Sequence, residues 1–448
     1  MTAMRRFSLL FAILLALILP LTAQALETHT LPNGLKVIIV EEHKAPVVTV
    51  QVWYKVGSRN EITGKTGLAH LTEHMMFKGT RKYGKGQFSR LIAKAGGTEN
   101  AFTGQDYTAY FENISKDQIE LALELESDRM ENLLVDPKEF ELEREVVKEE
   151  RRLRTDDDPQ SVVVESLFAT AFLVHPYHSP IIGWMTDLQS LTRGDVYSFY
   201  KKYYVPNNAT LVIVGDVDPK TLSPKIKRTF GKVPRSTEIA PLSITEPEQT
   251  GERRFTIKKE AQLPFVFAGF RVPHYVNRDA YALSVLANIL SAGKSSRLYR
   301  SLVYEQKLAL GAGGDYDGLS ADPDLFYFYG VPLPGKPIEE LEQAIFAEVE
   351  RLKTEMVSDR ELEKAKNQVA ASFIFGLDSN FFRAMQIGKA ETVGAGYNYQ
   401  ESYVEEIRKV SREDVLRVAK NYLVEDRRTV GVLFPLPPKA AASSQAAP

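Results

Sequence analysis

The run His70-Leu71-Thr72-Glu73-His74 has the residue types and the spacing needed to bind a metal ion and use it. On a helix that turns about 100° per residue, the two imidazoles and the carboxylate occupy roughly a third of the circumference. Two imidazoles on one face can hold a single Zn²⁺, and Glu73 can then reach a water molecule at the ion. The alternative is a pair of structural histidines that bind no metal.

The neighbouring residues predict the helix that this arrangement requires. Thr66 or Gly67 can begin the helix, and Gly79 can end it. Three apolar residues at helical spacing form its buried stripe: Leu68, Leu71 and Met75. A catalytic zinc site also needs a third protein ligand and leaves one position to water.

A later predicted helix, from Asp136 to about residue 154, offers candidates for the third ligand. The pair Asp136-Pro137 supplies the N-cap and the first-turn proline that begin such a helix. Its candidate ligands are Glu143, Glu145, Glu149 and Glu150. Glu143 and Glu150 are seven residues apart and share a face. The alternative is a solvated charged surface, and composition does not decide between the two.

The overall composition is that of an ordinary globular protein. The chain has 448 residues, 44% hydrophobic and 25% charged, which suits about two to three domains. The formal charge of −2 and the lack of a basic stripe argue against a nucleic-acid partner. There is no cysteine, so disulfides, a Cys nucleophile and a Cys₄ zinc site are excluded. Any zinc site must therefore use His and carboxylate ligands.

Residues 1–25 read as a secretory signal peptide that is cleaved after Ala25. Two arginines precede an almost wholly apolar stretch, and residues 23–25 form an Ala-Gln-Ala cleavage site. The alternative is an uncleaved membrane anchor, but the apolar stretch is short for a bilayer span. We therefore expect a periplasmic or secreted protein with no stable membrane span, whose formal charge changes from −2 to −4 on cleavage.

The remainder predicts an α+β protein built from two homologous units. The expected parts are an N-terminal domain (26–231), a linker (232–253), a C-terminal domain (254–436) and a disordered tail (437–448). Each unit begins with strands, continues with long helices and ends with a similar strand, Thr210–Val214 in the first and Thr429–Leu433 in the second. This repetition predicts two α/β-sandwich domains of about 200 residues, each a sheet covered by helices.

Within the first unit, the Asn33-Gly34 turn predicts a hairpin over residues 28–40. Val47–Tyr54 predicts a second long strand. A turn at Gly96-Gly97 is followed by one extended stretch that we expect to continue to Tyr110.

Several motifs together resemble the pitrilysin–insulinase family of zinc peptidases, most closely its short two-domain members of the processing-peptidase β-subunit type. Besides the His70–His74 run and the Glu143–Glu150 segment, the matching motifs are Gly67 to Thr80, Gly97 to Thr103, His175-Pro176-Tyr177, Asn207 to Asp216 and Ser295 to Tyr299. The resemblance covers nearly the whole mature chain. It implies that the two domains face each other as a clamshell around a peptide substrate.

The resemblance also implies a role for each matching residue. The zinc ligands would be His70, His74 and Glu150, with Glu73 as the general base that deprotonates the zinc-bound water. Glu143 would orient a ligand histidine by accepting its other N–H. Asn100, Ala101 and Phe102 would lie on an edge strand that binds the substrate backbone by strand addition.

One departure from the family concerns the second half. Active members carry an Arg and, seven positions later, a Tyr that bind substrate and stabilise the oxyanion, and here those positions hold Val303 and Leu310. Neither can donate a side-chain hydrogen bond, and one lost oxyanion donor costs about 3 kcal/mol. Arg297 and Tyr304 have the same spacing, but Arg297 belongs to a separate motif.

The sequence therefore predicts a zinc endopeptidase that needs a related second subunit, in a heterodimer or a homodimer, to supply the missing pair. The alternative is a non-catalytic subunit that keeps zinc, which the intact Glu73 disfavours. A zinc hydrolase of another substrate class is disfavoured by the strand-addition segment at Asn100. We expect the His175-Pro176-Tyr177-His178 segment to be a loop and not a second metal site.

Overall fold

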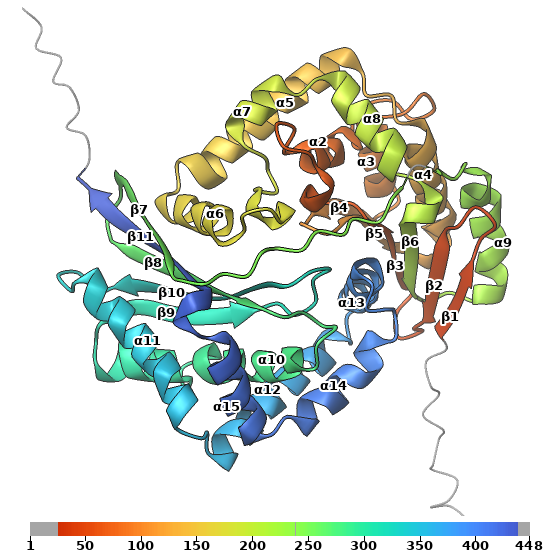
Figure 1. Cartoon of the computed structure of the whole chain (residues 1–448). Coiled ribbons are helices and arrows are strands. Elements are labelled where there is room, and N and C mark those ends of the chain that lie inside the picture. The colour runs from red at the N-terminus through yellow and green to blue at the C-terminus, as the bar shows by residue number, and fades with distance from the viewer. Residues whose placement is uncertain (1–25, 238, 438–448) are drawn as a thin grey trace, which may run out of the picture.

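The computed structural model describes residues 26–237 and 239–437, so the predicted signal peptide and all but the first residue of the predicted tail lie outside it. The described chain forms two α/β halves, each built on one β-sheet (Figure 1). In this part of the chain, no helix combines the length and the apolar character needed to cross a membrane.

The first half contains a six-stranded sheet in the order β1-β2-β6-β3-β5-β4. Its strands are β1 (Leu26–Thr30), β2 (Lys36–Glu41), β3 (Val47–Tyr54), β4 (Thr98–Thr103), β5 (Thr108–Ser115) and β6 (Ala209–Gly215). The predicted hairpin and the predicted strand β3 are confirmed. The single extended stretch to Tyr110 is wrong, because a turn in which Gly104 donates its N–H to Tyr107 O (2.8 Å) separates β4 from β5. As a result, β4 is an edge strand.

The second half contains a five-stranded sheet in the order β7-β11-β8-β10-β9. Its strands are β7 (Arg253–Glu260), β8 (Phe265–Val272), β9 (Ala309–Tyr316), β10 (Asp324–Pro332) and β11 (Arg428–Leu436). The order and directions match β2-β6-β3-β5-β4, since the first pair is parallel and the other three are antiparallel in both sheets. This shared topology confirms the predicted duplication.

Helices cover both sheets. Those of the first half are α2 (Leu68–Met75), α3 (Gln87–Lys94), α4 (Ile119–Asn132), α5 (Pro137–Arg151), α6 (Pro159–Ala171), α7 (Met185–Ser190), α8 (Arg193–Tyr203) and α9 (Pro219–Thr229). Those of the second half are α10 (Asp279–Ser291), α11 (Ile338–Thr354), α12 (Asp359–Gly376), α13 (Asn380–Val393), α14 (Tyr399–Lys409) and α15 (Arg412–Tyr422).

One helix from each half packs on the sheet of the other half. Helix α6 of the first half lies against β7, β8 and β11, and helix α13 of the second half lies against β3 and β6 (Figure 1). Leu167 of α6 shares a buried cluster with Phe265 and Leu433. On α13, Gly388 lies so close to the buried Trp53 that an added Cβ would be 2.1 Å from the indole nitrogen. The halves therefore face each other and share their apolar cores.

Helix α2 is placed by its N-terminus and by its apolar stripe. Gly67 adopts a left-handed conformation (φ 86°) in which a larger residue is strained. The Glu61 carboxylate accepts the N–H groups of Gly67 (2.9 Å) and Ala69 (2.7 Å), which satisfies two free donors of the helix end. The predicted stripe of Leu68, Leu71 and Met75 is buried in the first core. With this stripe buried, the opposite side of α2 faces a cavity.

Candidate metal centre

Three potential metal ligands converge between α2 and α5. His70, His74 and Glu150 each offer one atom, and these atoms all lie within 4.8 Å of one another. Glu150 Oε2 is 3.3 Å from His74 Nε2 and 3.9 Å from His70 Nε2. Ligands about 2.0–2.1 Å from a tetrahedral zinc ion lie about 3.4 Å apart, so this spacing suits zinc. No second cluster of three such side chains exists in the part of the chain that the structure describes.

The state of His70 also suits a metal ligand. Burial, together with the charges of His74 and Arg154, lowers the pKa of His70 to about 3, so the imidazole is neutral at physiological pH. Its Nδ1 is buried without a hydrogen-bond partner among the described residues, and its Nε2 is too far from Glu150 for a hydrogen bond. Because metal binding needs a neutral imidazole, His70 can bind without first losing a proton.

Glu143 holds the second imidazole. Its Oε1 lies 2.9 Å from His74 Nδ1, and its Oε2 lies 2.5 Å from Lys78 Nζ. Burial alone would raise the pKa of Glu143, but the hydrogen bonds from His74 and Lys78 outweigh it and hold this pKa below its usual range. An ionised Glu143 accepts the proton of Nδ1, which leaves the Nε2 lone pair of His74 directed at Glu150.

Glu73, one helical turn from His70, faces the same cavity. The Thr103 hydroxyl at the end of β4 donates a hydrogen bond to Glu73 Oε2. Burial raises the pKa of Glu73, although this hydrogen bond opposes the shift. A carboxylate whose pKa moves toward neutral is a better proton acceptor at physiological pH. Thr103 and Lys78 were missed from the sequence, because their partners lie on other elements of the fold.

The structure distinguishes the four candidate ligand glutamates of α5. Asp136 caps this helix by accepting the N–H groups of residues 138 and 139. Glu143 and Glu150 point toward α2, as their shared face requires. Glu145 and Glu149 are more than half exposed. Each forms an ion pair with a residue three positions later, Glu145 with Lys148 and Glu149 with Arg152.

A cavity of about 730 Å³ surrounds these groups. Its wall includes the predicted substrate-binding residues Asn100, Ala101 and Phe102 of edge strand β4. Because side chains alternate along a strand, Thr103 points to Glu73 while the Phe102 ring packs edge-on against Trp53, with 5.4 Å between ring centroids. The Phe102 side chain is thus occupied by packing, and β4 offers mainly its backbone to a ligand.

A π-helical turn, Arg152–Asp156, continues α5 beyond the potential ligands. It places Arg154 on the cavity wall, where Nη1 lies 2.7 Å from Glu150 Oε1. This contact leaves Oε2 as the oxygen of Glu150 nearest to the imidazoles. Arg154 therefore adds a cation beside the candidate ligands, and its four-residue spacing from Glu150 is the sequence signal that could have identified it.

The cavity wall contains no residue of the second half among the described residues. Val303 is half-buried against the second core, and Leu310 is exposed on β9. The Arg297 guanidinium is held by both carboxylate oxygens of Glu361, each at 2.8 Å, and Tyr304 is 74% exposed. Arg297 and Tyr304 are therefore not arranged as a replacement pair.

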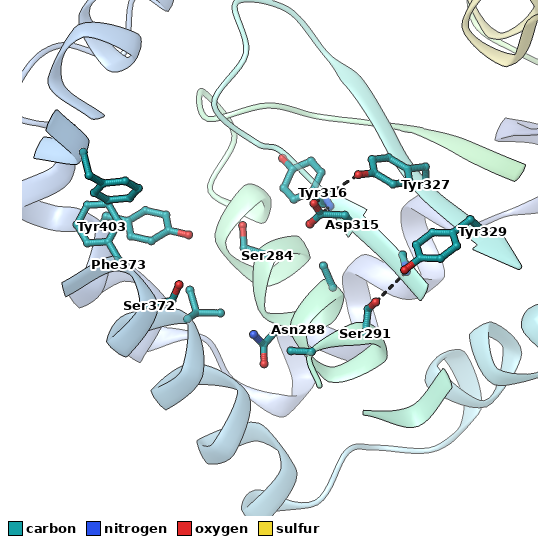
Figure 2. Close-up of a pocket in the computed structure, with 15 residues that line it drawn as sticks. Ser284, Asn288, Ser291, Asp315, Tyr316, Tyr327, Tyr329, Ser372, Phe373 and Tyr403 are labelled. Atoms are coloured by element: carbon teal, nitrogen blue, oxygen red, sulfur yellow. Dashed lines mark hydrogen bonds between the residues drawn. The ribbon is translucent and has the colours of Figure 1, made fainter. Parts of the chain in front are cut away.

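The second half has its own cavity, of about 570 Å³, lined mainly by residues of α10, α12, β9 and β10 (Figure 2). Asn288 lies sixteen residues beyond the end of β8, as His70 does beyond the end of β3. Ser372 is the fourteenth residue of α12, as Glu150 is of α5. Figure 2 shows Asn288, Ser372 and several tyrosines around this cavity. The wall of this cavity thus carries amide and hydroxyl groups, and no imidazole is among its described lining residues.

Two parts of the chain match known protein families. Residues 36–184 match the family described as insulinase, peptidase family M16, and residues 190–369 match the description peptidase M16 inactive domain. The chain belongs to the M16 peptidase family. It is 36% identical over 416 residues to a protein named zinc protease PqqE from Helicobacter pylori, covering 91% of this chain and 93% of that one.

Other relatives extend the similarity. An uncharacterized zinc protease of Mycobacterium leprae is 31% identical over 410 residues, covering 91% of both chains. The crystal structure of a protease from Helicobacter pylori superposes with a TM-score of 0.88 at 36% identity, over 92% of this chain and 100% of that chain. A peptidase M16 inactive domain from Pseudomonas fluorescens has the same fold, with a TM-score of 0.84 at 18% identity over 92% and 98% of the two chains.

Proposed function

We propose that this chain is an exported, zinc-dependent endopeptidase that hydrolyses peptides or unfolded protein segments. The observation that carries the proposal is the convergence of His70, His74 and Glu150 beside a buried Glu73 in one cavity. The names of the relatives, zinc proteases, support the choice of metal. Export is supported by the signal-peptide pattern of residues 1–25.

In this proposal, His70, His74 and Glu150 hold Zn²⁺. When bound there, the ion would polarise the scissile carbonyl and make a neighbouring water molecule more acidic. Glu143 keeps the Nδ1 proton of His74 in place, so that Nε2 remains a lone-pair donor. The substrate backbone adds to the free edge of β4 at Asn100 and Ala101, which brings a peptide bond beside Glu73.

Glu73 is the proton carrier in the proposed reaction. The hydrogen bond from Thr103 engages Oε2, so Oε1 is the atom that accepts the proton of water. Glu73 then passes this proton to the leaving amine. Its raised pKa makes Glu73 a stronger proton acceptor than an exposed glutamate.

The test compares the purified wild type with Glu73→Gln and with the control Glu145→Gln, an exposed glutamate. Zinc content is measured by mass spectrometry, and cleavage is followed with a fluorogenic peptide. We expect Glu73→Gln to keep its zinc and to lose at least about 100-fold in rate, while Glu145→Gln behaves as wild type. Equal cleavage by wild type and Glu73→Gln would falsify the role of Glu73.

We further propose that a related subunit completes the site. The motivation is that Val303 and Leu310 replace hydrogen-bonding residues and that the second half contributes nothing to the cavity wall in the described chain. The chain alone is then expected to cleave peptides slowly, and a copurified partner should raise the rate by about 100-fold or more. Full activity of the isolated monomer, unchanged by Val303→Ala or Leu310→Ala, would contradict the proposal.

The second candidate function is a non-catalytic subunit that binds zinc and peptides. This non-catalytic function is favoured by the absence of the Arg/Tyr pair, whose positions hold Val303 and Leu310. The zinc and cleavage measurements separate the two functions, because this candidate predicts stoichiometric zinc and no cleavage with any partner from the native source.

A further inference from the structure

A buried polar cluster joins the two halves away from the candidate metal ligands. Asp322, on the loop between β9 and β10, lies against Arg59 of the first half, and its Oδ2 is 3.1 Å from His175 Nε2. Tyr177 donates its hydroxyl to both carboxylate oxygens of Asp106, at 2.8 and 2.9 Å. The backbone N–H of Asp322 donates in turn to the Tyr177 hydroxyl at 3.3 Å. The His-Pro-Tyr motif therefore contributes two members of a cross-half network.

This network holds the turn between β4 and β5. Asp106 belongs to that turn, and its Oδ2 accepts the N–H of Ala321 from the second half at 3.0 Å. On the other side, Ser58 and Arg59 donate their N–H groups to Gly104 O (3.2 Å) and Gln105 O (3.0 Å). The turn is thus clamped between a short 3₁₀ helix of the first half and a loop of the second.

The clamped turn continues directly into the candidate site. Thr103 is the last residue of β4 and lies three positions before Asp106. Its hydroxyl donates to Glu73, the proposed base. A displacement of the turn would therefore move the donor that orients Glu73 and the strand proposed to bind substrate.

The electrostatics favour a geometric role for Asp322. Burial would raise the pKa of Asp322, but the hydrogen bond from His175 and the charge of Arg59 outweigh it and keep the carboxylate ionised. A buried ion pair holds one specific arrangement, and removal of one partner is costly when the other charge is left without a counter-charge. Arg59 keeps Asp106 as a second partner at 3.4 Å when Asp322 is replaced. The loss of Asp322 should therefore affect the position of the turn more than the stability of the fold.

We infer that Asp322 is a positioning residue through which the second half braces the β4–β5 turn, and with it Thr103 and Glu73. His175 positions the Asp322 carboxylate, and Tyr177 positions the Asp106 carboxylate, by hydrogen bonding. The inference rests on the proposed peptidase function for its kinetic consequence, but not for its structural one. It gives the second half a part in the reaction that needs no hydrogen-bonding residue at position 303 or 310.

The structural test uses hydrogen–deuterium exchange on the metal-free full-length protein. Asp322→Asn keeps the side-chain shape, and Asp359→Asn is the control, because Asp359 is an exposed aspartate of the same half that pairs with Arg412. We expect amides of residues 98–108 to exchange at least about tenfold faster in Asp322→Asn only, with β3 and β6 unchanged as evidence of an intact fold. Wild-type exchange of residues 98–108 in Asp322→Asn overturns the inference, whether or not the protein is a peptidase.

The kinetic test is a double-mutant cycle between Asp322 and Thr103. Asp322→Asn should lower kcat by about 10-fold to 100-fold, with zinc affinity and KM nearly unchanged. If the brace acts through Thr103, adding Asp322→Asn to Thr103→Val should cost less than about threefold more. Fully multiplicative effects would show that Asp322 acts by another route and would overturn the assignment. A wild type without any peptidase activity would refute the proposed function and leave the exchange experiment to decide the brace.

Discussion

Replacement of Glu143 by alanine tests the most specific contact of the candidate metal centre. The carboxylate is 10% exposed and has two partners, His74 Nδ1 at 2.9 Å and Lys78 Nζ at 2.5 Å. Its removal leaves His74 free to rotate or to change tautomer and leaves Lys78 as an unpaired cation beside the site. The loss of such a partner typically weakens metal binding by about 10-fold to 100-fold. This range corresponds to about 1.4–2.8 kcal/mol of binding free energy.

Zinc affinity would be measured by competition with a fluorescent chelator of known affinity, at fixed pH and ionic strength. Glu145→Ala is the matched control, because Glu145 lies on the same helix two residues further on but points to solvent. We expect the dissociation constant of zinc to rise by about 10-fold to 100-fold for Glu143→Ala and to stay unchanged for the control. A change of less than about threefold in a folded Glu143→Ala protein would refute the argument that this carboxylate orients His74.

Three further outcomes follow from the structure. Burial would raise the pKa of Glu361, but the hydrogen bond and charge of Arg297 hold this pKa below its ordinary value in the folded protein. The pair therefore stabilises the fold above about pH 4.5, and this stabilisation is lost as the pH falls through the pKa of Glu361 in the folded protein. Glu361→Gln should therefore lower the free energy of unfolding by about 1–3 kcal/mol at pH 7, with a difference from wild type that shrinks as an acid denaturation series goes below pH 4.5. Removal of zinc by a chelator should lower Tm by several degrees, measured by calorimetry, and a chelator-sensitive Tm in His74→Ala would contradict the assigned site. Gly388→Ala should cost about 1–3 kcal/mol in urea unfolding, because its methyl group would overlap Trp53; wild-type stability would show that α13 can shift freely.

Local patterns were sufficient to predict the core of the candidate site. His70, Glu73 and His74 lie on one short helix, so their spacing alone fixes their relative positions. Local spacing could not identify the ligand among the glutamates of α5. Glu143 and Glu145 are the same residue type on the same helix, and only the orientation of the helix decides which of them faces α2. That orientation depends on packing between helices distant in sequence, and only the resemblance to a family favoured Glu143 and Glu150.

Long-range features escaped the sequence for a related reason. The role of Thr103 depends on a hairpin turn that was predicted as continuous strand, since residues 104–107 carry only a weak turn signal. The His175–Asp322 contact joins residues 147 positions apart, and no periodicity reports it. The duplication could be predicted from the similar terminal strands of the two halves. The exchange of α6 and α13, in which each helix packs on the sheet of the opposite half, could not be predicted, because an apolar helix face does not specify the sheet that it covers.

The exchange of α6 and α13 makes the two halves interdependent for folding. Without the opposite half, one sheet would lose α6 and expose Phe265 and Leu433, and the other would lose α13 and expose Trp53 and Val212. Neither half is then a soluble fragment by itself, and the chain should unfold in one cooperative step. The same exchange limits how far the halves can separate, because a wide separation would break the two buried clusters that they share.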